Sequence, residues 1–222
     1  MTPILIHCIF LITVYRTNSS DVIQWVKNNE YANLCTNTTF VVNCKDHVDD
    51  FCSNYLDNVG EECYSILNYI TSVYDKRDDQ KKILFSIPGS VHRIKKRRIK
   101  FYKILQEVMK RKGDITYVDH GATITFKSQS NFTKRHHQGS TVNQPRQMIP
   151  ASIEPFREWF RHYFGDSFPE DVTHSQGIFA VDTKRIHNHP LELYLKLLEE
   201  TKKGLALEVC HYLERSWRAM WI

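Results

Sequence analysis

The order of apolar and polar positions divides the chain into strand-like and helix-like segments. A nearly uninterrupted apolar run covers residues 4–15, and shorter runs cover residues 39–43, 82–87 and 177–181. Such runs are typical of strands that are buried on both faces of a parallel sheet. We therefore predict that these four strands share one sheet and that the first strand is central.

The segments between these strands have the spacing of amphipathic helices. Cap-type residues near position 18 lead into a first helix, a turn at Asp57–Gly60 leads into a second, and a basic third helix runs from about Ile94 to Lys112. Alternating strands and helices indicate a mainly parallel sheet with helices on both faces. The prediction is a single α/β domain over residues 1–222.

A polar segment interrupts this alternation at about residues 127–150. It contains scattered Gly and Pro and is longer than most connections in compact domains. Loops of this length are often lids over a site, so we expect a mobile flap here.

The last helix carries a polar stripe beside an apolar one. At helical spacing, Glu208, His211 and Arg215 lie on one stripe, next to an apolar stripe that ends in Trp217 and Trp221. Either the polar stripe is a surface ladder of charges, or it faces a cleft where a carboxylate and an imidazole exchange protons with a substrate.

Charge is distributed unevenly, although the formal net charge of +5 is mild. The stretch His92–Lys112 is strongly basic and the stretch Cys44–Cys63 is acidic. The basic stretch is either a solvated helix face or a patch for an anionic partner. Because no recognised nucleic-acid-binding module surrounds it, a nucleic acid is not the expected partner.

The apolar start is too short for a transmembrane helix, which needs about 20 apolar residues. A secretory signal peptide is the alternative to a strand, and sequons at Asn18, Asn37 and Asn131 agree with it. Removal of the start would also remove Cys8 and leave an odd number of cysteines. We favour the strand, and with it the cytoplasm over the secretory pathway.

Several common signatures are missing. The sequence has no G-x-G-x-x-G, P-loop, H-E-x-x-H or G-x-S-x-G motif, which argues against the corresponding nucleotide-binding, protease and hydrolase classes. The cysteines between Cys35 and Cys63 lack the close pairs of zinc sites, although a disulfide is compatible with secretion. The pair His136-His137 lies in the polar segment. No metal ligands are predicted, and no cofactor is identified.

Five segments, in order, resemble the family called domain of unknown function 3431. They are "LITVYRTNSSDVIQWV", "FVVNCK", "LDNVGEECYSILNYITSVYD", "GIFAVDTKRIHNHPLELYLKLLEE" and the tail "LEVCHYLERSWRAMWI". The resemblance covers most of the chain. The chain departs from the family pattern at Glu61, where relatives carry Arg, and at "SIPGSVH" after the third strand.

The order of elements in that family is similar to that of a small A-type glycosyltransferase fold. This resemblance implies a sugar nucleotide at the carboxyl ends of the first strands. The implied substrate-binding residues are Arg16, Thr17 and Asp21 beside the nucleotide, Asn58 and Gly60 in a turn near it, and Arg215. Glu208 and His211 would be the catalytic residues on the acceptor side, although no D-x-D metal motif follows the third strand.

The rival hypothesis is a non-catalytic binding protein on the same fold. It would use the basic helix at residues 93–112 to bind an acidic partner.

Overall fold

The computed structural model describes residues 6–15, 18–28, 35–46, 49–76, 80–137 and 146–222, and its centre is a six-stranded sheet. The strands, in sheet order, are β3 (Asn54–Leu56), β2 (Asn37–Lys45), β1 (His7–Tyr15), β4 (Lys82–Pro88), β10 (Phe179–Asp182) and β5 (Tyr117–Asp119). The first four are parallel to one another, whereas β10 is antiparallel to its neighbours β4 and β5. The predicted mainly parallel sheet is confirmed, with β1 in its interior.

Strand β1 shows why an uninterrupted apolar run becomes a central strand. Cys8, Phe10 and Ile12 pack into the core on one face of the sheet, while Ile9 and Leu11 pack into the core on the other. The Phe10 ring stacks on its cross-strand neighbours in both adjacent strands, with its centroid 4.9 Å from that of Phe85 in β4. The strand prediction is therefore confirmed for residues 7–15.

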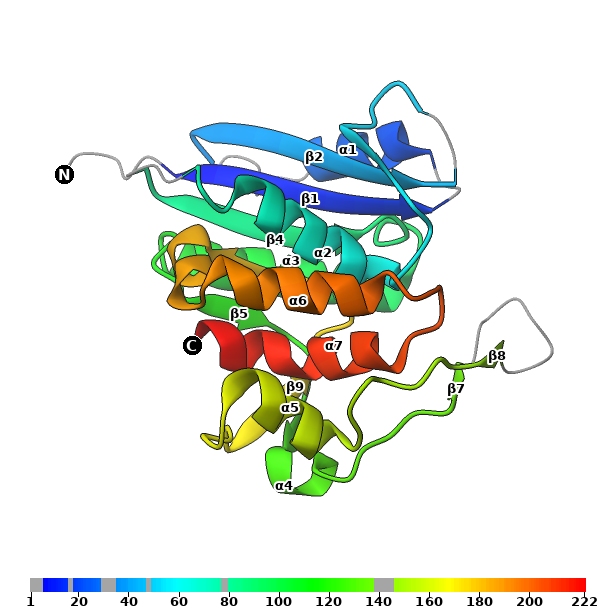
Figure 1. The fold of residues 1–222 in the computed structure, drawn as a ribbon. Coiled ribbons are helices and arrows are strands. Elements are labelled where there is room, and N and C mark those ends of the chain that lie inside the picture. The colour runs from blue at the N-terminus through cyan, green and yellow to red at the C-terminus, as the bar shows by residue number, and fades with distance from the viewer. Residues whose placement is uncertain (1–5, 16–17, 29–34, 47–48, 77–79, 138–145) are drawn as a thin grey trace.

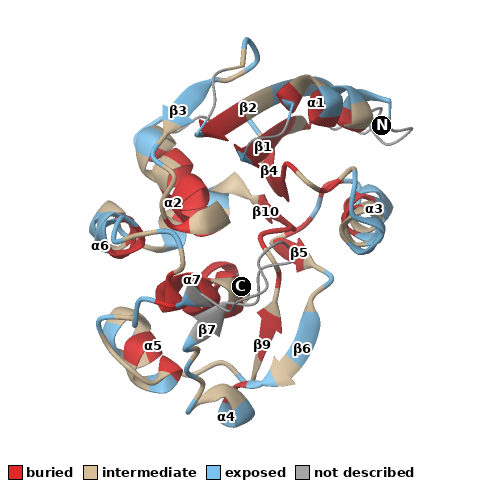
Figure 2. Cartoon of the chain, turned by 90° about the vertical axis from the view of Figure 1, so that its right-hand side faces the viewer, coloured by how far each residue is buried: buried red, intermediate tan, exposed pale blue. Residues whose placement is uncertain are grey.

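Helices cover both faces of the sheet (Figures 1 and 2). Helices α1 (Ser19–Lys27) and α3 (Lys95–Lys110) cover one face, and α2 (Glu61–Val73), α6 (Leu191–Thr201) and α7 (Glu208–Trp221) cover the other. Each buries an apolar stripe, as the helical spacing predicted, and α6 packs mainly on α2 and α7.

Helix α7 is the centre of the second face. Trp217 and Trp221 are fully buried and stack with their ring centroids 5.2 Å apart, and Trp221 also contacts Phe179 of β10. This burial explains the apolar stripe at the end of the sequence.

Most of the remaining elements pack beyond α7. They are α4 (Phe126–Gln129), α5 (Phe156–Phe164), the antiparallel pair β6 (Ala122–Thr125) and β9 (Asp171–His174), and the pair β7 (His136–His137) and β8 (Arg146–Gln147). The 3-10 helix η2 (Thr183–Asn188) follows β10 and contacts β4, β10 and α7. The segment predicted as one long loop thus includes the end of α4 and the pair β7–β8. Residues 138–145, at the tip of the predicted flap, lie outside the described residues, so the flap stays a prediction.

Three disulfides join all six cysteines: Cys8–Cys35, Cys44–Cys52 and Cys63–Cys210. Cys8 lies in the central strand and is needed for the even count. Disulfides are typical of oxidising compartments, and the compartment of this protein stays a prediction. No helix within the described part of the chain is long and apolar enough to cross a bilayer.

Candidate ligand-binding site

A cavity of about 340 Å³ opens at the carboxyl edge of the parallel strands. It is lined by Thr13, Tyr15, Lys45, Asn58, Glu61, Glu62, Arg97, Leu205 and Ala206. These residues come from the ends of β1 and β2, the turn after β3, the first turns of α2 and α3, and the segment before α7. Strand β1 has β2 on one side and β4 on the other, so the direction in which the sheet grows reverses at β1. Ligands of open α/β sheets bind at such a switch point.

Other cavities of similar size lie elsewhere. One of about 380 Å³ includes Lys82, the first residue of β4, and therefore lies at the amino edge of the parallel strands. Two more, of about 430 and 350 Å³, lie against the end of α7 near Arg218. The carboxyl-edge cavity is the candidate site because the starts of two long helices and several charged groups meet there.

Lys45 places a positive charge under the floor of this cavity. Its side chain is only 2% exposed, and its Nζ donates hydrogen bonds to the carbonyl oxygens of Val59, at 2.6 Å, and of Glu61. Burial lowers the pKa of Lys45 to about 8, although the nearby carboxylates of Glu62 and Glu61 favour its charged form. The ammonium group therefore holds the backbone turn that starts α2.

That turn has a left-handed backbone. Gly60 and Glu61 have φ angles of 57° and 45°, and a Cβ atom on Gly60 would lie 2.5 Å from the carbonyl oxygen of Thr201. Glycine is thus required at position 60, while Glu61 adopts a conformation that is costly for a residue with a side chain. Such strain is frequent at functional positions.

Glu61 carries the most perturbed carboxyl group of the cavity. Burial, together with the negative charges of Glu62 and Glu214, raises its pKa to about 8. A carboxyl group with a pKa near neutral pH is suited to general acid–base catalysis. Glu61 is therefore the candidate proton acceptor on the cavity wall.

The start of α3 adds positive charge to the opposite wall. Arg97 lies in the first turn, and its Nη1 donates a hydrogen bond to the Ser90 hydroxyl. The same nitrogen lies 4.0 Å from Oε1 of Glu62. This turn contains no acidic residue and no side-chain cap. The N-terminal end of a helix dipole is positive, so basic residues there are not stabilised by the dipole. An external anion, by contrast, would be stabilised both by the basic side chains and by the helix dipole.

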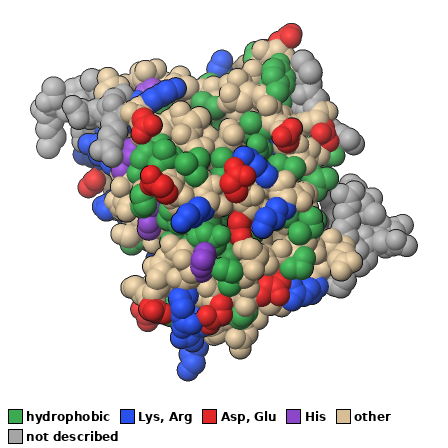
Figure 3. Space-filling model, in the orientation of Figure 1, with side chains coloured by type: hydrophobic (Ala, Val, Ile, Leu, Met, Phe, Trp, Pro, Cys, Tyr) green, Lys and Arg blue, Asp and Glu red, His purple; other side chains and the backbone are tan. Residues whose placement is uncertain are grey.

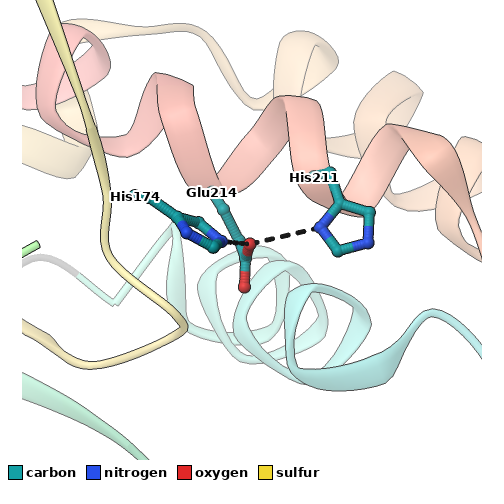
Figure 4. A group of neighbouring side chains, drawn as sticks. All are labelled: His174, His211 and Glu214. Carbon is teal, nitrogen blue, oxygen red and sulfur yellow. Dashed lines mark hydrogen bonds and ion pairs between the residues drawn. The ribbon is translucent and has the colours of Figure 1, made fainter. Parts of the chain in front are cut away.

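A second group of ionisable side chains lies next to the cavity (Figure 4). His174 at the end of β9 and His211 on α7 lie on either side of Glu214, with Nε2 of His174 2.6 Å and Nδ1 of His211 3.4 Å from Glu214 Oε2. Burial would raise the pKa of Glu214, but the hydrogen bonds with His174 and His211 outweigh it and hold that pKa at about 2. Burial lowers the pKa of His211.

A narrow cavity of about 10 Å³ lies next to both groups. Glu61, Glu62 and Glu214 all contribute to its lining. The His174–Glu214–His211 cluster is therefore adjacent to the carboxyl-edge cavity.

Glu208, predicted to be catalytic, is fully buried at the start of α7. Its carboxylate accepts hydrogen bonds from the backbone N–H groups of Lys134 and Ala151, the latter at 3.1 Å, and from Arg135 Nη1 at 3.3 Å. It thus ties two segments of the polar region to α7. Its catalytic role stays a prediction, and this geometry gives it a structural role.

Arg215 is also held by structural contacts. Its Nη1 donates to the His211 carbonyl oxygen at 2.8 Å, its Nε donates to Gln129 at 3.1 Å, and the guanidinium lies 3.8 Å from the centre of the Phe132 ring. A substrate-binding role for Arg215 stays a prediction.

The other predicted residues are divided. Asn58 lines the cavity and donates to Asp46 at 2.6 Å, and Gly60 forms the turn beside it. Asp21 is exposed in the first turn of α1. Arg16 and Thr17 lie outside the described residues.

Three site residues were not found from the sequence: Lys45, Glu61 and His174. A lysine at the end of an apolar strand was a usable signal for Lys45, and Glu61 was noticed only as a departure from the family pattern. His174 carries no local signal, because its partners are 37 and 40 positions further along the chain.

Comparison of the chain with models of known protein families, with curated proteins and with solved structures finds no match in any of the three. The resemblance drawn from the motifs therefore stays a prediction.

Proposed function

We propose that the protein is a glycosyltransferase-like enzyme that binds a sugar nucleotide in the carboxyl-edge cavity and transfers its sugar to a hydroxyl group. The observation that supports this most directly is the pairing, in one cavity, of cationic groups with a carboxyl group whose pKa is about 8. The cationic groups are needed to bind the diphosphate, and the carboxyl group is needed to deprotonate an acceptor.

The diphosphate would lie at the start of α3. Arg97 and the backbone N–H groups of the first turn are suited to phosphate oxygens, and Arg can donate two parallel hydrogen bonds. Lys45 contributes charge from beneath but is committed to the turn at residues 59–61. Arg97 is therefore the side chain expected to contact the diphosphate.

The transfer step would use Glu61 as the base. The acceptor oxygen forms a bond to the anomeric carbon, the bond from that carbon to the phosphate oxygen breaks, and the nucleoside diphosphate leaves with the electron pair. The Glu61 carboxylate takes the acceptor's hydroxyl proton. His211 lies next to Glu214, and Glu208 accepts a hydrogen bond from the backbone N–H of Ala151.

The test is a thermal-shift panel of UDP-, GDP- and CMP-sugars, with and without Mn²⁺, followed by calorimetric titration of any nucleotide that stabilises the protein. Loss of one charge-assisted hydrogen bond costs about 1.5–3 kcal/mol, so Arg97→Ala should weaken binding by roughly 10–100-fold. Arg98→Ala is the matched control, because Arg98 has the same charge on the same helix but does not line the cavity.

Glu61→Gln separates binding from chemistry. We expect it to bind the nucleotide and to lose sugar transfer to added acceptors. No stabilisation by any sugar nucleotide, or equal loss of affinity in Arg97→Ala and Arg98→Ala, would contradict the proposal.

The rival function, binding of an acidic partner, is supported by the exposed basic residues of α3. Lys95 and Lys96 are exposed on the face opposite α6 and α7. By contrast, the face over α6 carries charges of both signs, mixed with apolar side chains (Figure 3). Replacing Lys96, Arg97 and Arg98 by Gln should weaken the binding of such a partner and make it less dependent on salt. Arg97→Ala alone would have a small effect on this binding.

A further inference from the structure

The cluster of His174, His211 and Glu214 has the composition of a metal site. His211 and Glu214 are three positions apart on α7 and therefore project from the same side of the helix. His174 reaches them from the end of β9. One nitrogen from each imidazole and one carboxylate oxygen lie within 4.8 Å of one another, and Figure 4 shows both rings directed at the carboxylate.

The distances fit a transition-metal ion after small side-chain rotations. Zinc bonds to histidine nitrogen and carboxylate oxygen are about 2.0–2.2 Å long, which places tetrahedral ligand atoms roughly 3.4 Å apart. The His211 Nδ1 to Glu214 Oε2 distance is already 3.4 Å. The 2.6 Å distance from His174 Nε2 must open, and His174 is the most exposed of the three side chains, at 32%.

Carboxyl groups gather beside the cluster, because Glu61 and Glu62 line the narrow cavity together with Glu214. Lys134 and Arg215 oppose a cation here: the charge of Lys134 acts on His211 and Glu61, and that of Arg215 acts on His211. Lys100 is engaged elsewhere, since its Nζ donates to the carbonyl oxygens of His174 and Ser175 at 3.3 and 2.8 Å and thereby anchors the end of β9.

We propose that Nε2 of His174, Nδ1 of His211 and Oε2 of Glu214 bind one Zn²⁺ ion. Two imidazoles and one carboxylate are the donor set of zinc sites that keep a coordination position open for water or substrate. Because Glu61 and Glu62 line both cavities, this position would be beside the proposed sugar-nucleotide site. The free protein would bind the ion without any nucleotide, so the proposal can hold or fail separately from the proposed function.

The test uses the full chain after treatment with a chelator. Titration with Zn²⁺ should show one tight site per chain by calorimetry and an increased melting temperature, whereas Mg²⁺ should produce neither. Co²⁺ should produce the visible absorption bands of a four-coordinate ion, and Zn²⁺ should abolish these bands by displacement.

Two variants assign the ligands. His174→Ala removes the most exposed ligand, and Glu214→Gln keeps the shape and a hydrogen-bonding oxygen but removes the negative charge. Loss of an outer-shell partner alone weakens metal binding by about 10–100-fold, so each variant should weaken the tight site by at least roughly 100-fold. His162→Ala, which removes an exposed histidine on α5, should bind Zn²⁺ like the wild type.

Circular dichroism identifies variants that fail to fold, and Glu214→Gln is expected to remain folded even if His174→Ala does not. Absence of a tight site in the wild type would overturn the proposal. So would tight binding that survives in the folded Glu214→Gln variant. In either case the cluster would be a hydrogen-bonded group only.

Discussion

The two faces of the sheet are built from different kinds of residues. The face covered by α1 and α3 packs apolar side chains such as Phe10, Phe85 and Phe101 against each other. Within the described chain, every buried lysine, arginine, glutamate or histidine belongs to the other side: these are Lys45, Glu200, Glu208, His211 and Arg215. The first face is thus held mainly by hydrophobic burial, while the second also depends on directional hydrogen bonds.

This difference bears on where a site can be. Buried polar groups cost free energy unless they are paired, and they fix a unique arrangement when they are. The candidate site lies where the second face meets the carboxyl edge. The apolar face supplies a stable support, and the polar face supplies the chemistry.

The disulfides sharpen the contrast, and removing them should have the largest effect. Cys8–Cys35 and Cys44–Cys52 belong to the first face and span 27 and 8 positions, whereas Cys63–Cys210 joins α2 to α7 across 147 positions. In the chain-entropy description, the long loop contributes roughly 5 kcal/mol and the loop of 8 positions contributes roughly 2.5 kcal/mol. The double variant Cys63→Ala with Cys210→Ala should therefore lose about twice the unfolding free energy lost by Cys44→Ala with Cys52→Ala.

Denaturant unfolding under non-reducing conditions measures both values. An equal or larger loss in the Cys44 and Cys52 variant would show that the two faces are not distinguished in this way.

The second prediction concerns Glu208, the most enclosed acid of the polar face. Glu208→Gln leaves one oxygen to serve three donors and turns an amide N–H₂ group toward backbone N–H groups. Unsatisfied buried groups of this kind cost about 1–3 kcal/mol each, so we expect a loss of roughly 2–4 kcal/mol in unfolding free energy. Glu107→Gln is the control, because this partly exposed acid of α3 pairs with Arg111 four positions along the helix, and the expected change is below about 1 kcal/mol.

This variant also decides the predicted catalytic role of Glu208. A variant with wild-type stability and no transfer activity would support catalysis and would contradict the structural role that its contacts indicate.

The contrast between the faces also explains what the sequence could predict. The strands β1, β2 and β4 and the helix α2 follow from apolar periodicity, because each contains an apolar run or stripe that can be recognised without knowledge of its partner. The polar stripe of α7 was located, but the surroundings of its members were not. Glu208 meets the backbone near Ala151, whereas His211, about 4.5 Å further along the helix axis, meets Glu214.

The missed part of the site depends on contacts between distant segments. The high pKa of Glu61 results from burial together with Glu62 and Glu214, and Glu214 is more than 150 positions away in the chain. No local spacing encodes this juxtaposition.

The smallest expected effect is a pH dependence that belongs to Glu61. The pKa of this carboxyl group is about 8 in the folded protein and 4.5 ordinarily, so between these values the folded state holds a proton that the unfolded state has lost. Stability contributed at this position therefore falls as the pH rises from about 4.5 to 8. Lys45 affects stability over a higher pH range. Because its pKa is lowered from 10.5 to about 8, its destabilising contribution to the unfolding free energy is removed as the pH rises from 8 to 10.5.

Glu61→Gln should remove the first slope and leave the second. One pKa unit corresponds to about 1.4 kcal/mol, but Glu61 is only half-buried on a cavity wall, and solvent screening reduces the effect to roughly 1–3 kcal/mol at pH 8. The variant should match the wild type in unfolding free energy at pH 5 and exceed it at pH 8, as measured by denaturant unfolding across this range.

Glu62→Gln makes the same chemical change one position away, and a similar pH-dependent gain there would assign the slope to the acidic pair rather than to Glu61. If the difference in unfolding free energy between Glu61→Gln and the wild type stays constant from pH 5 to 8, the folded protein does not retain a proton at Glu61. The carboxyl group would then lack the raised pKa on which its proposed role as a base depends.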